Sequence, residues 1–255
     1  MPVLRLLQEL WDRIASTQTL PPDWVIAASA AVALIAVLGA RPWHLARNAI
    51  TIAHEGGHAL VSLLTGRRLD GIRLHSDTSG VTYSSGRLTG PGVVLTLAAG
   101  YLTPPLLGAG AAWLLAAHHV TAMLWLLIVL LAATFLAIRN AYGVLAVLVT
   151  GGVILAVSWL ASAALEAAFG YVAVWFLLLG GVRPVIELMT QRHRGARGRA
   201  GVSDADQLAR LTGVPGGVWV GFFLIVSVAA LILGARLLVA GAVHLPHLAA
   251  LARLD

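Results

Sequence analysis

The chain has 255 residues, of which 59% are hydrophobic and 11% charged, and its mean hydropathy is +0.87. A soluble domain averages roughly a quarter charged residues, so this composition excludes an ordinary water-soluble protein and predicts a surface that mostly faces lipid. There is no cysteine, which excludes disulfides and thiolate metal sites and leaves His, Asp and Glu as metal-binding residues. The arginines are spread over the loops and no nucleic-acid-binding motif is present. We therefore attribute the pI near 11 to membrane topology and expect no nucleic-acid partner.

Residues 1–22 are predicted to form an amphipathic helix at the membrane surface. Apolar side chains recur at helical spacing between residues 4 and 14, with charged side chains on the opposite face, and a Pro-Pro pair ends the segment. This pattern differs from that of a secretory signal peptide. Residues 23–240 are predicted to form one membrane-embedded domain, followed by a C-terminal tail over 241–255.

Hydrophobic segments dominate that domain. A hydrocarbon core about 30 Å thick needs about 20 helical residues to cross it. Segments of about this length, with few charges, lie at 24–40, 44–65, 91–117, 119–138, 143–162, 168–189 and 217–240. The fold class predicted from them is an all-α polytopic membrane protein with about seven transmembrane helices.

Two connecting segments are long enough to carry structure of their own. Within residues 66–90, apolar and polar residues alternate on both sides of a Gly-containing turn, which predicts a β-hairpin over 69–88, directly after the second hydrophobic segment. Residues 190–216 form a basic, Gly-rich loop. Arginines mark the cytoplasmic side of membrane proteins. With seven spans and a cytoplasmic N-terminus, twelve arginines lie on the cytoplasmic side and three or four on the other. This predicts that the N-terminus, the hairpin and the basic loop all face the cytoplasm.

A zinc-protease motif lies inside the second hydrophobic segment. Residues 54–58 read His54-Glu55-Gly56-Gly57-His58, and residues four apart lie on one face of a helix, one turn apart. The two histidines can therefore offer imidazole nitrogens to one metal ion, with Glu55 beside them as general base. Zinc lowers the pKa of bound water to about 7, so that a glutamate can take its proton and pass it to the leaving amine. The motif predicts metal binding by His54 and His58 and a catalytic role for Glu55.

The context of the motif supports this interpretation. HExxH is expected by chance about 0.005 times in a chain with this number of His and Glu residues. A Glu and two His inside a span are costly to bury and are functional by default. The alternative is a helix–helix contact, with glycines for close packing and histidines for interhelical hydrogen bonds. His58 lies about seven residues, or about 11 Å, before the end of its segment, which predicts a metal inside the bilayer region, nearer the cytoplasm.

A catalytic zinc site requires a third protein ligand, and here it must be a carboxylate. Asp70 lies twelve residues after His58 and would reach the metal only if the hairpin folded straight back. Glu166 falls at the far membrane face in the predicted topology. Glu187 lies one helical turn from Arg183, which is typical of an ion pair near a helix end.

Two aspartates remain on the side of the metal, Asp204 and Asp206. Ser203 and Asp206 fit the pattern of a capping box, which would begin a short helix in the basic loop. This structural role accounts for Ser203 and Asp206 but not for Asp204. We therefore favour Asp204 as the third ligand and keep Asp206 as the alternative.

HEGGH inside a span, a hairpin directly after it and a Gly- and Pro-rich next segment together resemble the site-2 protease family of intramembrane zinc metallopeptidases. The likeness is greatest to the poorly characterised bacterial branch and covers most of residues 44–232. The stretches Ala99–Leu102, Arg139-Asn140 and Ser203–Ala205 contribute to it. Asn140 is a candidate for a substrate-orienting amide, the other interpretation being interface anchoring at a helix end.

The resemblance implies one zinc ion per chain, bound by His54, His58 and a downstream Asp, with Glu55 catalytic. Better-known members carry an Asn-Pro…Leu-Asp-Gly motif on a later helix. Leu69-Asp70-Gly71 has the right letters in the wrong place, so Asp204 stands as the alternative form of the third ligand.

The function predicted is that of a zinc metalloendopeptidase in the bacterial inner (plasma) membrane. Its partners would be the lipid bilayer and a single-span membrane protein, cleaved near the cytoplasmic side in regulated intramembrane proteolysis. A protease needs an extended substrate, and the hairpin could supply a strand to pair with. The alternative function is a non-proteolytic metal-binding membrane scaffold or transporter. No feature of the sequence indicates an oligomeric state.

Overall fold

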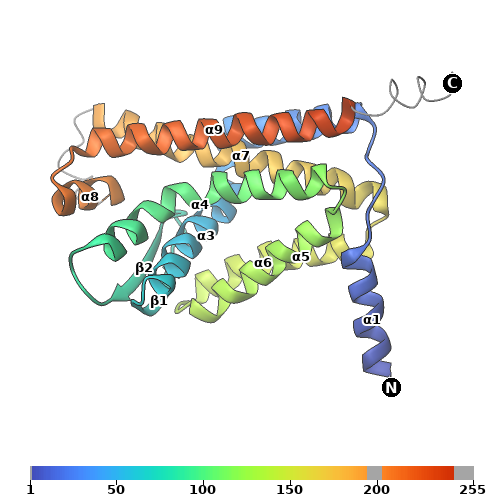
Figure 1. Cartoon of the computed structure of the whole chain (residues 1–255), viewed down its shortest axis with the longest axis horizontal. Helices are drawn as coiled ribbons and strands as arrows, with labels where there is room; N and C mark the ends of the chain where they lie inside the picture. Colours follow the sequence, from blue (N-terminus) through green and yellow to red (C-terminus); the bar gives the residue numbers. More distant parts are fainter. Residues whose placement is uncertain (1, 194–202, 244–255) are drawn as a thin grey trace, which may run out of the picture.

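The computed structural model describes residues 2–193 and 203–243 and is mostly helical (Figure 1). Residues 194–202 of the predicted basic loop and 244–255 of the predicted tail lie outside this description. In chain order the elements are α1 (Pro2–Ala15), α2 (Asp23–Leu38), α3 (Ala40–Leu64), β1 (Arg68–Leu74), β2 (Gly80–Ser85), α4 (Pro91–Ala116), α5 (Val120–Ala137), α6 (Ala141–Leu160), α7 (Ala163–His193), α8 (Asp204–Thr212) and α9 (Gly216–Val243).

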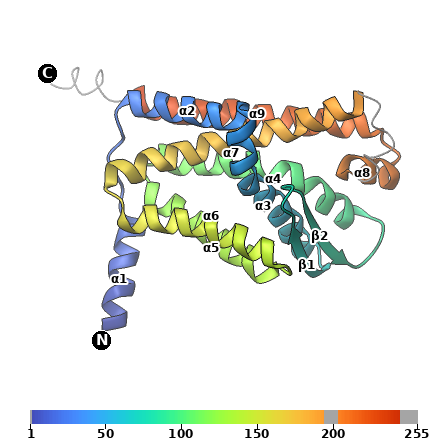
Figure 2. The same ribbon diagram turned by 180° about the vertical axis from the view of Figure 1, so that it is seen from behind.

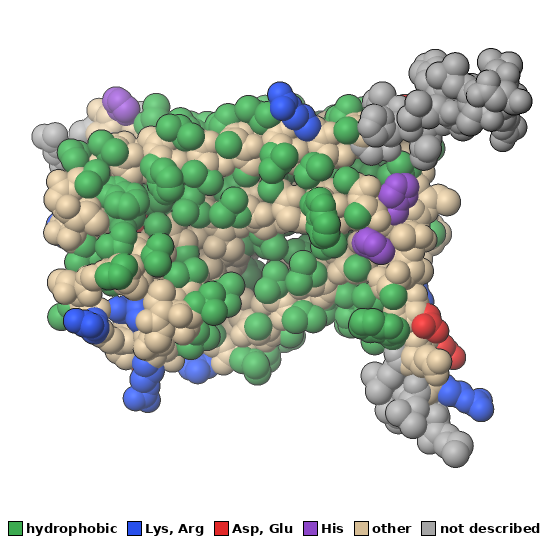
Figure 3. Space-filling view, viewed as in Figure 1, with side chains coloured by type: hydrophobic (Ala, Val, Ile, Leu, Met, Phe, Trp, Pro, Cys, Tyr) green, Lys and Arg blue, Asp and Glu red, His purple; other side chains and the backbone are tan. Residues whose placement is uncertain are grey.

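Long helices run side by side along the longest axis, as Figures 1 and 2 show from opposite sides. α4 packs against α3, α7 and α9, while α5 packs against α6. Apolar side chains cover most of the face seen in Figure 3, and most of its charged side chains lie toward the two ends. α1 lies crosswise to the bundle at one end, and the hairpin and α8 lie at the other (Figure 1). This distribution is expected of a bundle whose long sides face lipid.

The structure does not confirm the predicted count of seven spans. All seven predicted hydrophobic segments are helical, but within the described residues only five helices are by themselves long and apolar enough to cross a membrane. α2 and α3 pass the same test together, as a pair bent by 98° at Gly39, which makes six at most. α2 has 16 residues, or about 24 Å, too few to cross a bilayer alone.

Counting α2 and α3 as one candidate span bears on the predicted topology. Seven spans placed the N-terminus and the hairpin on one side, whereas in the structure α1 and the hairpin lie at opposite ends of the bundle (Figure 1). The prediction that both face the cytoplasm counted α2 and α3 as two crossings, whereas the two helices together make one candidate span, so the side that each end faces stays a prediction.

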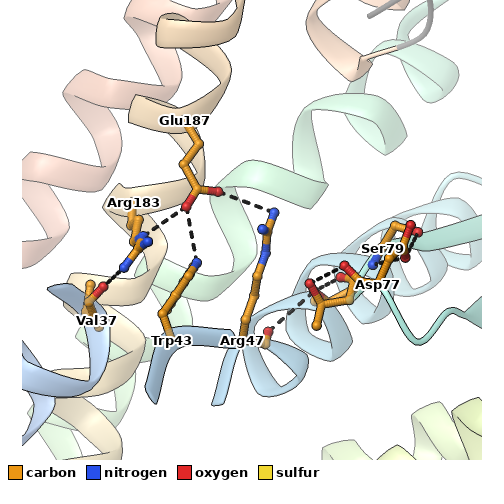
Figure 4. A network of polar contacts seen from close by, with 9 residues as sticks. Val37, Trp43, Arg47, Asp77, Ser79, Arg183 and Glu187 are labelled. Carbon is orange, nitrogen blue, oxygen red and sulfur yellow. Dashed lines mark hydrogen bonds and ion pairs between the residues drawn. The ribbon is translucent and has the colours of Figure 1, made fainter. Parts of the chain in front are cut away.

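A polar network holds the bend between α2 and α3 against α7 (Figure 4). The Glu187 carboxylate accepts hydrogen bonds from Arg183 Nε at 2.9 Å and Trp43 Nε1 at 3.1 Å, and Arg47 Nη2 lies 3.4 Å from it. Arg183 also donates to the carbonyl of Val37 and lies over the Trp43 ring. The predicted ion pair of Arg183 with Glu187 is confirmed, and it fixes the start of the helix that carries HEGGH.

The predicted hairpin is confirmed. β1 and β2 pair antiparallel from Arg68 opposite Ser85 to Leu74 opposite Gly80, with a bulge near Gly71. At its turn, the Asp77 carboxylate accepts hydrogen bonds from Ser79, which is the local bonding expected of Asp in a turn (Figure 4).

The hairpin folds straight back along α3. Thr51 Oγ1 donates to the carbonyl of Thr78 in the turn at 2.8 Å, and Thr51 precedes the end of α3 at Leu64 by 13 residues, or about 20 Å. Ile72 and Leu74 of β1 are buried in a cluster that includes residues of α3 and the α5–α6 connection. This packing holds the hairpin beside the metal-binding motif.

The outer edge of β1 is occupied by the α5–α6 connection. Ile72 forms a parallel bridge with Ile138, and Arg139 N donates to Ile72 O at 2.9 Å. The Asn140 side chain accepts from Leu74 N at 3.2 Å and donates to Leu74 O at 2.6 Å. Asn140 is therefore a hairpin anchor, and its amide is engaged with β1 rather than free to orient a substrate.

Candidate metal centre

Three predicted ligand atoms converge between α3 and α8. His54 Nε2 lies 3.1 Å from His58 Nε2 and 3.1 Å from Asp204 Oδ2, and His58 Nε2 lies 3.3 Å from the same oxygen. A zinc ion with bonds of about 2.0–2.1 Å to tetrahedral ligands separates them by roughly 3.3 Å. Two imidazoles and one carboxylate at these separations fit a single zinc ion. Within residues 2–193 and 203–243, they form the one group of three such side chains close enough to share an ion.

A hydrogen bond to the ring nitrogen that faces away from the other ligand atoms fixes the orientation of His58. Its Nδ1 lies 2.7 Å from the carbonyl of Thr96 on α4. A carbonyl can only accept, so Nδ1 carries a proton, and Nε2 is the nitrogen that faces His54 and Asp204. A metal-binding histidine typically has such a partner on its other nitrogen. The Tyr101 ring meets the His54 ring edge-on at 4.8 Å and limits how that imidazole can turn.

Two glycines allow α3 and α4 to approach closely at this level. A Cβ on Gly57 would lie 2.7 Å from Thr103 Cβ and 3.0 Å from the carbonyl of Ala99. A Cβ on Gly100 would lie 2.5 Å from His54 Nε2 and closer still to His58 Nε2. Gly57 of the motif therefore serves helix packing, and Gly100 of α4 clears the space in front of the imidazoles.

Glu55 is buried, and β2 holds its carboxylate. The Thr82 hydroxyl lies 2.6 Å from Glu55 Oε2, a short hydrogen bond to a charged acceptor, and 3.1 Å from the Glu55 carbonyl. A Cβ on Gly80 would lie between 2.6 and 2.9 Å from atoms of the Glu55 side chain. The carboxylate thus packs directly on the backbone of β2, which only glycine permits at this position.

Asp204 reaches the site from the first turn of α8. The predicted capping box is present: Ser203 Oγ accepts from Asp206 N at 3.3 Å and donates to Asp206 Oδ2 at 2.6 Å. Arg192 of α7 donates to the other Asp206 oxygen. Ala205 and Leu208 are buried against α4, α7 and α9, which seats the helix. The side chain of Asp204 is therefore left to point at the histidines.

The pKa values of both aspartates are lowered. Burial opposes ionisation of Asp204, but the charge and hydrogen bonds of His58 and His54 hold its pKa well below the usual range. Burial also opposes ionisation of Asp206, where hydrogen bonds from Ser203 and Arg192 lower the pKa. Each carboxylate is therefore charged at neutral pH, as a zinc ligand and a helix cap require.

The other carboxylates considered from the sequence lie elsewhere. Asp70 sits at the start of β1, half-exposed, with Arg68 Nε at 3.7 Å. The sequence argument against it was that the hairpin would have to fold back. The hairpin does fold back, yet Asp70 remains outside the group of ligand atoms. Glu166 is buried at the start of α7, with Ser158 Oγ 3.4 Å away. Glu187 belongs to the network of Figure 4.

The ligand atoms and Glu55 border a cavity of about 670 Å³. α3 and α4 contribute its inner part, β2 forms one wall and α8 another. The lining residues are His54, Glu55, His58, Arg67, Gly80, Val81, Thr82, Ser84, Leu88, Val93, Thr96, Leu97, Tyr101, Ser203, Asp204, Gln207, Arg210 and Leu211. The cavity has the size of a ligand site and could admit several residues of an extended peptide.

Sequence reasoning did not find the residues that support the site. Thr96, Thr82 and Gly80 carry no motif, and their roles depend on segments that meet only in the folded chain. Gly100 and Tyr101 belong to a stretch that contributed to the family resemblance, and that was the only signal for them in the sequence.

An HExxH pair on a membrane-embedded helix, completed by an aspartate from a separate helix, is the arrangement of a membrane metallopeptidase. A comparison with protein-family models agrees. The model described as Peptidase M50B-like matches residues 27–234, so the chain belongs to this family of zinc metallopeptidases, and the resemblance to site-2 proteases is confirmed. No curated protein and no solved structure matched the chain in the same comparisons.

Proposed function

We propose that the chain is an intramembrane zinc endopeptidase that cleaves a single-span membrane protein near its cytoplasmic side, in regulated intramembrane proteolysis. The observation that carries the proposal is the convergence of His54, His58 and Asp204 beside Glu55, in a cavity large enough for a peptide. Burying these ionisable side chains within a lipid-facing bundle is costly unless it serves chemistry.

Each residue has a distinct role in this reaction. Zinc, when bound, supplies a Lewis acid that polarises the peptide carbonyl and makes water a stronger nucleophile at neutral pH. His54, His58 and Asp204 hold the ion. Glu55 Oε1 or Oε2 takes a proton from the attacking water and returns it to the leaving amine. Thr82 orients the Glu55 carboxylate through its hydroxyl.

The hairpin supports substrate binding by strand addition. A substrate span enters as a helix and must find new partners for its backbone when it is extended in lipid. The α5–α6 connection covers the outer edge of β1, whereas β2 has no strand on its outer edge among the described residues. Gly80, Thr82 and Ser84 of β2 line the cavity. An extended substrate can therefore pair with β2 while its scissile bond lies beside the metal site.

We infer that the hairpin end faces the cytoplasm. The hairpin, the α5–α6 connection and α8 lie at that end, and the corresponding stretches of the sequence, 66–90, 138–140 and 190–216, contain ten of the seventeen arginines. An excess of arginine in loops between spans marks the cytoplasmic side. The N-terminal helix α1 then faces the opposite side, because it lies at the other end of the bundle (Figure 1).

Replacement of Glu55 by glutamine tests the proposal. The full chain, in nanodiscs with one equivalent of zinc, is incubated with a model single-span peptide, with and without chelator. We expect Glu55→Gln to lower the cleavage rate by about 10²–10⁴-fold, because a general base is lost, while zinc content and thermal stability stay unchanged. Cleavage by this variant at the wild-type rate would refute the mechanism. Zinc binding without cleavage by the wild-type protein would favour a metal-binding scaffold or transporter.

A further inference from the structure

Two arginines line the cavity without taking part in the chemistry. On α8, Asp204, Gln207, Arg210 and Leu211 all border the cavity, and their spacing of three or four residues places them in one stripe along the helix. Arg210 follows Asp204 by six residues, or about 9 Å of helix. The stripe therefore leads from the metal site outward to an exposed guanidinium.

The opposite wall of the cavity, formed by β2, also ends at an arginine. Alternate residues of β2, Gly80, Thr82 and Ser84, lead away from Glu55 at about 3.3 Å per residue. Arg67 Nε lies 3.4 Å from Ser84 Oγ, and Arg67 follows the end of α3. Each wall of the cavity therefore ends at an arginine. An extended peptide of about two to four residues would span the distance from the metal site to either arginine.

Neither guanidinium has an anionic partner within the described part of the chain. The ion pairs there join Arg47, Arg68, Arg183 and Arg192 to carboxylates, and none involves Arg67 or Arg210. Arg67 bonds only to uncharged groups, including the Arg87 carbonyl at 2.6 Å. The two carboxylates that line the cavity, Glu55 and Asp204, are engaged by Thr82 and the histidines. The outer part of the cavity is therefore positively charged.

We propose that Arg67 and Arg210 form a subsite for a carboxylate in the substrate, within about two to four residues of the scissile bond on the flank that leaves the bundle at the hairpin end. This inference rests on the proposed function and specifies its substrate class. The cytoplasmic flank of a membrane span is ordinarily rich in Lys and Arg. The positive charge of this cavity repels such a flank. The two arginines therefore favour the uncommon span whose flank is acidic.

A binding measurement tests the subsite independently of turnover. The probe is a fluorescent single-span peptide in which three consecutive positions on that flank are Glu, Gln or Lys, added to full-length, zinc-loaded Glu55→Gln protein in zwitterionic nanodiscs. We expect the Glu peptide to bind about fivefold more tightly than the Gln peptide, and the Lys peptide most weakly. The difference should shrink as salt is added. Arg210→Glu should reverse the order.

Arg73→Glu is the matched control, since it makes the same charge change on an exposed residue of the hairpin that lies outside the cavity. It should keep the wild-type order. Equal affinities of the wild-type site for the Glu and Lys peptides would overturn the proposal. The same change in peptide preference in Arg210→Glu and in Arg73→Glu would also overturn it. So would an effect of Arg210→Glu that appears only in anionic-lipid nanodiscs and is the same for all peptides, because the arginine would then bind lipid headgroups.

Two further arms complete the test. A peptide that ends at the flank, as a free acid or as an amide, separates a terminal carboxylate from a side-chain carboxylate, and preference for either supports the subsite. Turnover of the same peptides by wild-type protein is measured in parallel. A charge preference without turnover would refute the protease assignment but support the subsite. Turnover without a charge preference would support the protease assignment but refute the subsite.

Discussion

Replacing Gly100 with alanine should abolish tight zinc binding without unfolding the protein. The new Cβ would lie 2.5 Å from His54 Nε2 and closer to His58 Nε2, whereas ordinary contact begins near 3.4 Å. The imidazoles would have to withdraw by about 0.9 Å, and a metal site tolerates only about 0.2 Å of error in its bond lengths. His58 cannot withdraw freely, because its Nδ1 is bonded to Thr96.

The expected size of the effect follows from these distances. Loss of a single supporting partner around a metal typically costs 10–100-fold in affinity. An alanine at position 100 disturbs both imidazoles at once, so we expect about 100-fold weaker zinc binding and a comparable loss of cleavage at limiting zinc. Alanine favours a helix over glycine by up to about 1 kcal/mol, which offsets part of the cost of displacing the imidazoles, so the metal-free protein should remain folded.

The matched control is Gly110→Ala in the same helix. A Cβ at Gly110 meets nothing within 4 Å, so this variant makes the same chemical change without touching the site. Zinc affinity is measured by competition with a chromogenic chelator, and thermal unfolding is measured with and without metal. If Gly100→Ala bound zinc within threefold of the Gly110→Ala protein, the two imidazoles would not be facing an ion across Gly100.

Other variants test the supports of the site and the topology. Thr82→Val should lower the cleavage rate about tenfold at unchanged zinc content, since the general base loses a charge-assisted hydrogen bond; an unchanged rate would contradict the orienting role. Arg192→Gln should weaken zinc binding about tenfold, measured by chelator competition, because it loosens the helix that carries Asp204. A wild-type affinity would refute this. The chain lacks cysteine, so Ser16→Cys and Ser85→Cys give single labelling sites. A membrane-impermeant maleimide should reach them from opposite sides of sealed vesicles, and labelling from one side would contradict the shared crossing of α2 and α3.

Local patterns in the sequence were sufficient for much of this protein. The hydrophobic segments predicted a helical membrane protein, alternation around a Gly-containing turn predicted the hairpin, and HEGGH predicted two adjacent imidazoles with a carboxylate beside them. The capping box of Ser203 and Asp206 also formed as predicted. Each of these features depends on residues a few positions apart, which the periodicity of a helix or a strand relates directly.

From the sequence, Asp204 was chosen as the third ligand by excluding the other carboxylates, and one of those exclusions rested on an incomplete reason. The capping box correctly set Ser203 and Asp206 aside. Asp70, in contrast, was set aside because the hairpin was not expected to fold back, and it does. Asp70 nevertheless lies outside the metal centre, half-exposed near the start of β1 with Arg68 beside it. The direction in which a hairpin leaves a helix depends on packing with distant segments, here the α5–α6 connection.

Sequence alone determined the class of the protein and two of the three side chains of the candidate metal centre, because these follow from composition and from spacing within one helix. Only the tertiary structure showed that the first two hydrophobic segments form one pair of helices bent at Gly39, which carboxylate meets the histidines, and that Thr82, Gly80, Gly100 and Thr96 surround the site. Those facts depend on contacts between residues as far apart as His54 and Asp204, separated by 150 positions. No local pattern encodes such contacts, because they are settled by the packing of whole helices against one another.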